Sequence, residues 1–207
     1  MISQSIVVLD YQMGNLHSVK QKLNMIGVNA IVSSRYSDIC NADKIIMPGV
    51  GHFSNAMNNL KQLNLLDALN EFALVQQKPI LGICLGMQLM AKHSEEGNVS
   101  GLGWFDAEVV KFKVNDNLKY KIPHTGWNQV HIAKQSLLME KISELSEFYF
   151  VHAYHFKQNH KEDVLTYSEH EYRFVSSVEK DNIFGVQFHP EKSHDSGIQL
   201  FKNFISL

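Results

Sequence analysis

The first half of the chain alternates between short apolar runs and longer amphipathic segments. The runs are rich in Ile and Val, which favours strands, whereas the longer segments repeat their apolar residues every three or four positions, which favours helices. This pattern predicts strands at 6–9, 29–32, 44–47 and 80–83 and helices at 16–26, 53–73 and 85–91. Because strands that alternate with helices form parallel sheets, we expect a mainly parallel sheet with helices on both faces.

After about residue 104 the pattern changes to a series of strands. Alternating, β-branched and aromatic stretches predict strands at 108–114, 128–132, 148–156, 164–168, 174–179 and 183–188, with helices at 136–145 and 195–205. No linker, repeat or low-complexity tract separates the two halves. We therefore expect one α/β domain over residues 1–207, with a mixed sheet and its site at the carboxyl ends of the strands.

One of these carboxyl ends carries a cysteine. Cys84 stands between the strand at 80–83 and the helix that follows, and Gly82 and Gly86 flank it. The small neighbours let the backbone adopt strained angles and let a substrate approach closely. The helix N-terminus favours a thiolate and offers N–H groups to an oxyanion. Cys84 is therefore a candidate nucleophile, although a free cysteine is also often a small buried hydrophobe.

A candidate general base follows the last predicted strand. The strand at 183–188 leads into His189, Pro190 and Glu191. Pro190 ends the strand pairing, and Glu191 falls on the same side of an extended chain as His189. The carboxylate can then orient the imidazole that takes a proton from a thiol. A structural histidine at a sheet edge is the alternative, and the combination with Cys84 favours the triad.

The loop Pro48-Gly49-Val50-Gly51 also follows a predicted buried strand. Its two glycines permit a flipped peptide whose N–H points into a site. Together with the N–H of Leu85, this peptide would supply two donors to an oxyanion. A plain strand-to-helix turn is the alternative. A phosphate-binding loop is disfavoured because the Lys-Ser/Thr pair of such loops is missing.

Composition excludes several function classes. The chain has 19 basic and 21 acidic residues, so we expect no general affinity for nucleic acid or for anionic membranes. No apolar run is long enough for a membrane span or a signal peptide, and two cysteines make no disulfide framework, so the cytoplasm is the expected compartment. The histidines lack metal-binding spacing. His152 and His155 should face opposite sides of one strand, and we expect no metal and no other cofactor.

Several motifs, taken together, resemble those of the class I (triad) glutamine amidotransferases. The stretches GICLG at 82–86 and FHPEKS at 188–193 are shared widely in that family, and the GNL at 14–16, PGVGHF at 48–53 and IPHTGWN at 122–128 are more specific. These more specific motifs resemble the glutaminase subunits of imidazole glycerol phosphate synthases. The resemblance covers nearly the whole chain and implies a flavodoxin-like fold and hydrolysis of glutamine.

The resemblance also implies roles for individual residues. Cys84 would attack the side-chain amide carbon of glutamine, His189 would carry the thiol proton to the leaving ammonia, and Glu191 would orient His189. The backbone N–H groups of Val50 and Leu85 would hold the oxyanion. The residues expected to hold the amino-acid end of glutamine are Gly51, Gln88 and Glu96.

A partner is implied in the same way. In this family a (β/α)8-barrel cyclase subunit forms a heterodimer with the glutaminase and uses its ammonia to make imidazole glycerol phosphate and AICAR in histidine biosynthesis. The barrel is also expected to activate the glutaminase by letting the Val50 peptide adopt the oxyanion orientation. For Trp127 a core position in its strand is the alternative. The docking face is expected to include Asn15, Trp127, Tyr149 and Lys192.

Two positions depart from the family pattern. Ala153 stands where a Ser or Thr is usual, so one side-chain hydrogen bond to glutamine would be missing or replaced, and Thr125 replaces a more usual methionine. A paralogous group that supplies ammonia for acetamidino sugars of bacterial surface polysaccharide is therefore an alternative.

Two further function classes stay open at this point. A cysteine peptidase would also use Cys, His and a carboxylate, but would not need Gln88 or Glu96. A non-catalytic glutaminase kept for its partner would have lost a member of the triad, and all three are present. Cys40 lies among polar residues and is expected to be dispensable.

Overall fold

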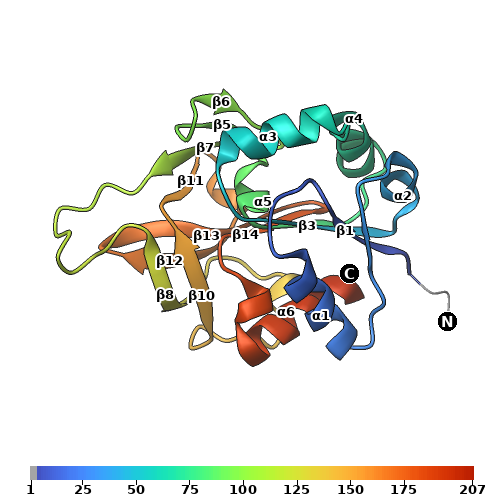
Figure 1. Cartoon of the computed structure of the whole chain (residues 1–207). Coiled ribbons are helices and arrows are strands. Elements are labelled where there is room, and N and C mark those ends of the chain that lie inside the picture. The colour runs from blue at the N-terminus through green and yellow to red at the C-terminus, as the bar shows by residue number, and fades with distance from the viewer. Residues whose placement is uncertain (1–3) are drawn as a thin grey trace.

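Five parallel strands form the half of the sheet that carries the predicted site (Figure 1). The computed structural model describes residues 4–207, so the first three residues of the predicted domain lie outside the described residues. The register pairs Gly49 with Cys84 and Ile83 with Val186, so three neighbouring strands end at the same edge. In spatial order the five are β2 (Ile31–Ser33), β1 (Ile6–Leu9), β3 (Lys44–Gly49), β4 (Ile80–Cys84) and β14 (Ile183–Val186).

The sheet continues beyond β14 with mostly antiparallel pairs. These strands are β13 (Tyr172–Lys180), β11 (Tyr154–Gln158), β7 (Phe105–Lys111), β5 (Ala91–Ser94) and β6 (Val99–Ser100), with β12 (Val164–His170) and β9 (His131–Ile132) branching from β13. A separate ribbon joins β8 (His124–Gln129) to β10 (Glu147–His152). The predicted α/β fold, with a mixed sheet that is parallel through its centre, is confirmed.

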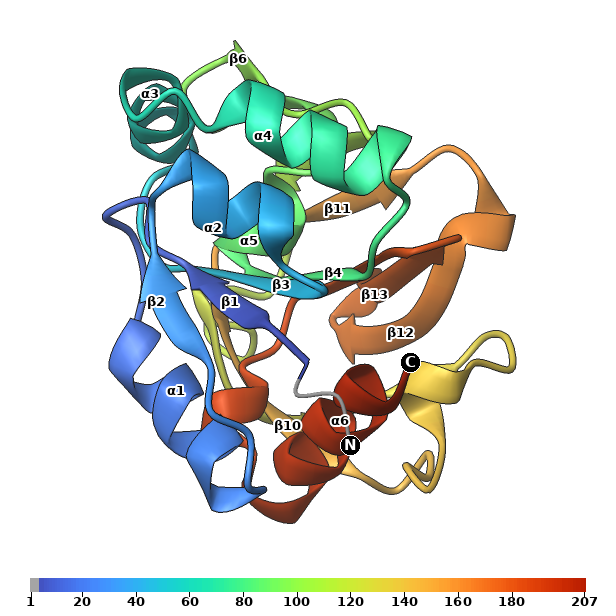
Figure 2. The same cartoon turned by 90° about the vertical axis from the view of Figure 1, so that its right-hand side faces the viewer.

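Helices cover both faces of the parallel strands, as predicted (Figure 2). One face carries α2 (Tyr36–Asn41), α3 (Phe53–Gln62), α4 (Leu66–Asn70), a π-helical turn (Glu71–Val75) and α5 (Leu85–Gln88); the other carries α1 (Leu16–Met25) and α6 (His194–Ser206). Short 3₁₀ turns lie at Leu137–Met139, Lys161–Asp163 and Pro190–Lys192. Within residues 4–207 no helix is long and apolar enough to cross a membrane.

The alternation of side chains along the strands explains why both faces need helices. In β1, Val7 and Leu9 belong to the core beneath α3 and α4, whereas Ile6 and Val8 belong to the core beneath α1 and α6. All four side chains are buried. Successive strand residues point to opposite faces, so a strand that is apolar throughout is stable only between two layers.

Three of the predicted helices differ from the structure. The helix expected at 136–145 is wrong, because the Asn203 side chain takes the carbonyls of Leu138 and Glu140 at 2.9 and 2.7 Å, leaving a single 3₁₀ turn. The helix expected at 53–73 breaks near Asn64, which adopts a left-handed φ of 54°. The helix expected at 85–91 is cut short because the carbonyls of residues 89–91 accept hydrogen bonds from the N–H groups of Leu102, Gly103 and Phe105.

The strand expected at 148–156 is also wrong, since it is two strands that belong to different sheets. β10 pairs with β8 in the ribbon, and β11 pairs with β7 and β13 in the main sheet. The break falls at Ala153, whose carbonyl accepts the N–H of Phe112 at 3.0 Å. Because the strand is broken, His152 and His155 do not face opposite sides as predicted, and both rings pack against Phe112, with centroids 5.2 and 4.6 Å away.

Candidate active site

Cys84 occupies a strained turn between β4 and α5. Its φ is 53° and its ψ is −109°, which is rare for a residue with a side chain. Such strain is concentrated at functional sites, where it holds a nucleophile above the end of a strand. The side chain is 6% exposed, and its sulfur lies at the edge where β3, β4 and β14 end.

The flanking glycines act differently from what the sequence suggested. The strained angle belongs to Cys84 itself, whereas Gly82 and Gly86 let backbone segments pack in direct contact. A Cβ on Gly86 would lie 1.8 Å from the carbonyl oxygen of Met47, and a Cβ on Gly82 would lie 2.7 Å from the backbone of Gly86. The turn is therefore seated directly on β3, with no space for a side chain.

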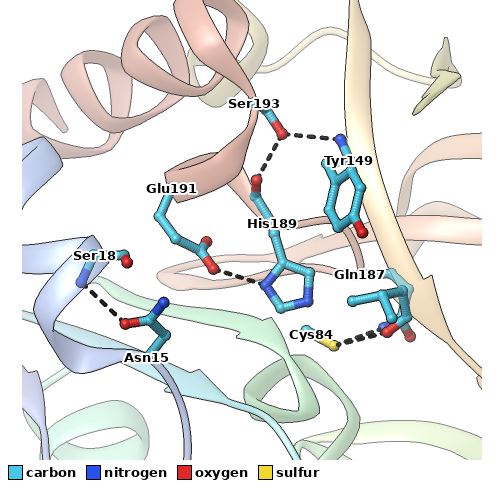
Figure 3. A network of polar contacts seen from close by, with 9 residues as sticks. Asn15, Ser18, Cys84, Tyr149, Gln187, His189, Glu191 and Ser193 are labelled. Carbon is cyan, nitrogen blue, oxygen red and sulfur yellow. Dashed lines mark hydrogen bonds and ion pairs between the residues drawn. The ribbon is translucent and has the colours of Figure 1, made fainter. Parts of the chain in front are cut away.

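His189 and Glu191 form a buried pair beside Cys84 (Figure 3). The Nδ1 of His189 lies 2.7 Å from Oε1 of Glu191, so the carboxylate fixes the tautomer that has Nε2 free. Nε2 is buried and has no hydrogen-bond partner within residues 4–207. Burial lowers the pKa of His189, but the charge of a Cys84 thiolate and the contacts with Glu191 outweigh it and raise the pKa to about 10.

The main chain around His189 is anchored by a serine that the sequence reasoning missed. Ser193 donates its hydroxyl to the His189 carbonyl at 2.6 Å and accepts the N–H of Tyr149 at 3.0 Å. The N–H of His189 in turn binds the Tyr149 carbonyl at 2.8 Å. The 3₁₀ turn that carries Glu191 is thereby tied to β10.

A cavity of about 170 Å³ opens over the Cys84 sulfur. It is smaller than the roughly 300–1,000 Å³ of pockets for drug-sized ligands, and it suits one small metabolite. The structure thus brings together every residue predicted for the oxyanion and the substrate, and His189 and Glu191 lie beside Cys84 (Figure 3). The lining residues are Val50, Gly51, Cys84, Leu85, Gln88, Glu96, Pro123, Val151, His152, Ala153 and Tyr154.

The two candidate oxyanion donors come from adjacent turns. Val50 follows Gly49, the register partner of Cys84, and Leu85 is the first residue of α5, where N–H groups lack partners within the helix. Val50 is exposed, and Gly51 has a φ of 127° that favours glycine. The loop therefore lies beside the sulfur in a conformation that depends on its glycines.

Two glutamine side chains connect the cavity to the sulfur. The Nε2 of Gln88 donates to the carbonyl of Tyr154 at 3.1 Å and to Oε1 of Gln187 at 2.9 Å. The Nε2 of Gln187 then donates to the sulfur of Cys84 at 3.5 Å (Figure 3). The sequence reasoning missed Gln187. The available signal was a lone polar residue in the apolar run 183–188, two positions before His189.

Comparison with known proteins identifies the family. A family model described as "Glutamine amidotransferase class-I" matches residues 7–207. The chain belongs to this family. It is a glutamine amidotransferase, as the triad motifs implied.

Two named relatives are similar to nearly the whole chain. An "Imidazole glycerol phosphate synthase subunit HisH 2" of Methanococcus maripaludis is 48% identical over 200 residues, which cover 97% of this amidotransferase and 98% of the relative. An "Imidazole glycerol phosphate synthase subunit HisH 1" of Campylobacter jejuni strain RM1221 is 47% identical over 203 residues, which cover 98% and 100% of the two chains.

Solved structures share the fold at low identity. PurLQS from Thermotoga maritima has a TM-score of 0.72 at 14% identity and covers 99% of both chains. A glutamine amidotransferase from Thermotoga maritima has a TM-score of 0.67 at 15% identity, covering 100% of this amidotransferase and 82% of that chain. These likenesses support the class I amidotransferase fold.

Three of the four predicted docking residues form one patch beside the candidate triad. The Trp127 ring meets Tyr149 edge-on at 6.0 Å and stacks on His194 at 4.9 Å, and the Lys192 ammonium lies 5.4 Å from the Tyr149 ring. Trp127 is 44% exposed, so the alternative of a core position is wrong. Asn15 caps the nearby helix α1 by accepting the N–H of Ser18 at 3.2 Å, and its place near Glu191 is visible in Figure 3.

Two buried histidines, His152 in the wall of the cavity and His124 next to it, form a hydrogen-bonded chain in which each proton position is fixed. The Nδ1 of His152 lies 2.7 Å from the Tyr154 carbonyl and must donate to it, so its Nε2 accepts from Nδ1 of His124 at 3.0 Å. The Nε2 of His124 accepts in turn from the Asn128 amide at 3.2 Å. A proton on either ring would place two donors face to face. Burial, helped by His170, lowers the pKa of His124 to about 4, and burial holds that of His152 well below its ordinary value.

This hydrogen-bonded histidine pair predicts a loss of stability in mild acid. In the unfolded chain His124 is protonated below about pH 6.5, whereas in the folded chain it stays neutral down to about pH 4. Between pH 7 and pH 5 this difference should lower the free energy of unfolding by about 2 kcal/mol. Urea unfolding at both pH values should show a smaller loss in His124→Gln, which cannot titrate. Equal losses in the variant and the wild type would contradict this assignment.

Proposed function

We propose that this amidotransferase is the glutaminase subunit of an imidazole glycerol phosphate synthase. It hydrolyses glutamine and transfers the ammonia to a cyclase subunit. The observation that carries the proposal is the convergence of Cys84 with the His189–Glu191 pair under a cavity lined by Gln88 and Glu96. The relatives named above support the choice of enzyme, since both are called subunits of imidazole glycerol phosphate synthase.

The first half of the reaction is acylation of Cys84. Its thiol proton moves to Nε2 of His189, and the thiolate attacks the amide carbon of glutamine, whose carbonyl electron pair moves onto oxygen. The N–H groups of Val50 and Leu85 stabilise this oxyanion. When the carbonyl re-forms, the C–N bond breaks and the nitrogen takes the proton of His189, so that ammonia leaves rather than an amide anion.

The second half releases glutamate. His189 takes a proton from water, and the resulting hydroxide attacks the glutamyl thioester. Collapse of this intermediate breaks the C–S bond and regenerates the thiolate opposite the imidazolium. Glu191 stabilises that imidazolium at each stage, in keeping with the raised pKa of His189.

The hydrogen bonds at the cavity suit the amino-acid end of glutamine. Both hydrogens of the Gln88 amide are committed, so only its oxygen is available to the ligand. Glu96 uses one carboxylate oxygen to accept the N–H of Phe53 at 2.8 Å and keeps the other. Two acceptors in one small cavity suit the α-ammonium group of glutamine. Ala153 lines the same cavity without a hydroxyl, so we propose that backbone groups take the place of the usual Ser or Thr.

A (β/α)8-barrel cyclase subunit is the proposed partner. Ammonia released into water at pH 7 would be protonated and would lose its nucleophilicity, so direct transfer between subunits is favoured. The exposed Val50 and the glycines beside it support activation by the partner, which would turn the Val50 peptide toward the oxyanion. The product of the complex would be imidazole glycerol phosphate, formed with AICAR in the cytoplasm.

The alternatives are less well supported. The relatives reported above are not named for sugar modification, so the surface-polysaccharide route is not favoured. A cysteine peptidase needs an extended groove for a chain, whereas Cys84 opens onto a cavity of about 170 Å³.

The transfer of nitrogen tests the proposal. Glutamine labelled with ¹⁵N in its side-chain amide is given to the amidotransferase together with the cyclase subunit from the same genome and its ribonucleotide substrate. We expect the label in the imidazole ring of the product, and faster glutamine hydrolysis than by the amidotransferase alone. Hydrolysis without labelled product would reject this acceptor while leaving the glutaminase assignment in place.

Trp127→Ala is expected to weaken the complex more than the fold. Exposed aromatic residues at interface centres often contribute about 2 kcal/mol or more to binding, so we expect the dissociation constant to rise about 30-fold. The melting temperature should change little, because Trp127 is 44% exposed. Titration calorimetry with the cyclase subunit measures the first effect, and Leu118→Ala, at an exposed apolar residue outside the predicted docking set, is the control. A large fall in melting temperature with unchanged affinity would contradict the docking role.

A further inference from the structure

Gln187 is a fully buried polar residue in contact with the reactive sulfur. Its backbone N–H binds the carbonyl of Ser176 at 2.9 Å, which fixes the chain just past β14. Its side chain is 0% exposed and lies between Gln88 and Cys84. A buried amide among apolar strand residues is costly unless each of its polar groups has a partner, and here both groups do.

The hydrogen bonds of Gln88 determine which way the Gln187 amide is oriented. The carbonyl of Tyr154 can only accept, so the group that Gln88 turns toward it is its nitrogen. The same nitrogen lies 2.9 Å from the end of Gln187, which must therefore be the Gln187 oxygen. The Gln187 nitrogen consequently faces the sulfur and can only donate to it.

A donor at this position stabilises the thiolate more than the thiol, because a thiol sulfur is only a weak acceptor. The thiol of Cys84 can point its hydrogen at the Val151 carbonyl, which lies 4.0 Å from the sulfur. Once the proton has moved to His189, the negative sulfur attracts the Gln187 N–H at 3.5 Å. Hydrogen bonds to an ionised acceptor are about twice as strong as those between neutral groups, so the contact favours the charged form.

We propose that Gln187 is a further catalytic residue of this glutaminase, which stabilises the Cys84 thiolate and holds the sulfur toward the substrate cavity. Gln88 and the Tyr154 carbonyl are positioning groups, because they orient the Gln187 amide without touching the sulfur. The proposal rests on the proposed function, since it concerns the nucleophile of that reaction.

The test measures thiolate formation without glutamine. The rate at which iodoacetamide alkylates Cys84 is followed from pH 5 to pH 10 in a Cys40→Ala background, so that only one thiol reacts. Gln187→Met has a similar size but no donor, and Gln187→Asn keeps an amide that is one methylene shorter. We expect the midpoint of the alkylation profile to rise by about one pH unit in Gln187→Met, which is about a tenfold slower reaction on the acidic side. Gln187→Asn should shift in the same direction.

Gln158→Met is the matched control, because Gln158 also buries its amide oxygen, but its amide nitrogen donates to Asp163 instead of Cys84. Its alkylation profile should be that of the wild type. A midpoint that stays unchanged in whichever Gln187 variant remains folded by circular dichroism would overturn the proposal, even if its melting temperature falls. A wild-type protein that shows no glutaminase activity even in complex with the cyclase subunit would instead reject the proposed function, which the alkylation profile does not measure.

Discussion

Cys84→Ala is expected to lower glutamine-dependent turnover by at least about 10³-fold, because removal of a covalent nucleophile leaves no path through a thioester. The substitution takes away the sulfur while leaving the cavity, His189 and Glu191 in place. Turnover of the complex with added ammonia should stay close to that of the wild type, since we assign that reaction to the proposed cyclase subunit. The ratio of the two activities therefore isolates the chemistry of the sulfur from any effect on assembly.

Cys40→Ala is the matched control for this experiment. Cys40 is the other cysteine of the chain. It is partly exposed and packs at the edge of the core beneath α3 and α4. It should keep both activities. Glutamine hydrolysis that survives in Cys84→Ala would reject the assignment of the nucleophile, and loss of ammonia-dependent turnover would point to a damaged complex.

Gly86→Ala is expected to lower the free energy of unfolding by about 3 kcal/mol or more, because the added methyl group meets backbone atoms that cannot rotate away. Its Cβ would lie 1.8 Å from the carbonyl oxygen of Met47 in β3. The melting temperature should fall by roughly 6–12 °C for a chain of this size. Glutamine hydrolysis should fall as well, since relief of the clash moves the turn that carries Cys84.

Gly103→Ala separates this clash from ordinary backbone strain. Gly103 has a positive φ of 73°, yet a Cβ there would meet nothing within 4 Å. Its substitution should lower the free energy of unfolding by only about 1 kcal/mol. Scanning calorimetry of both variants checks the comparison. A Gly86→Ala protein as stable as Gly103→Ala would show that the turn is not seated on β3 as described.

The central strands could be predicted from the sequence because their apolar runs are short and buried on both faces. The strands around Cys84 and before His189 were expected within a residue or two of their bounds. The order of strands and helices then predicted that both residues lie at one edge of a parallel sheet, which brings the candidate triad together.

The features that were missed depend on contacts between distant segments. The Asn203 side chain donates hydrogen bonds to two carbonyls in the segment 136–145, where a helix was expected. Nothing in the sequence of that segment indicates this contact with a distant residue. The strand break at Ala153 depends on a backbone bond from Phe112. Gln187 acquires its contact with Cys84 only because Gln88 and Tyr154 orient its amide from neighbouring elements.

Acid quenching during turnover tests the central claim, a glutamyl thioester on Cys84, most directly. The amidotransferase, in complex with the cyclase subunit, is stopped in acid within milliseconds of mixing with isotope-labelled glutamine, digested and analysed by mass spectrometry. We predict one labelled glutamyl group on the peptide that contains Cys84, and none in Cys84→Ala. Steady glutamine hydrolysis with no labelled peptide, or with the label on another residue such as Cys40, would contradict the account.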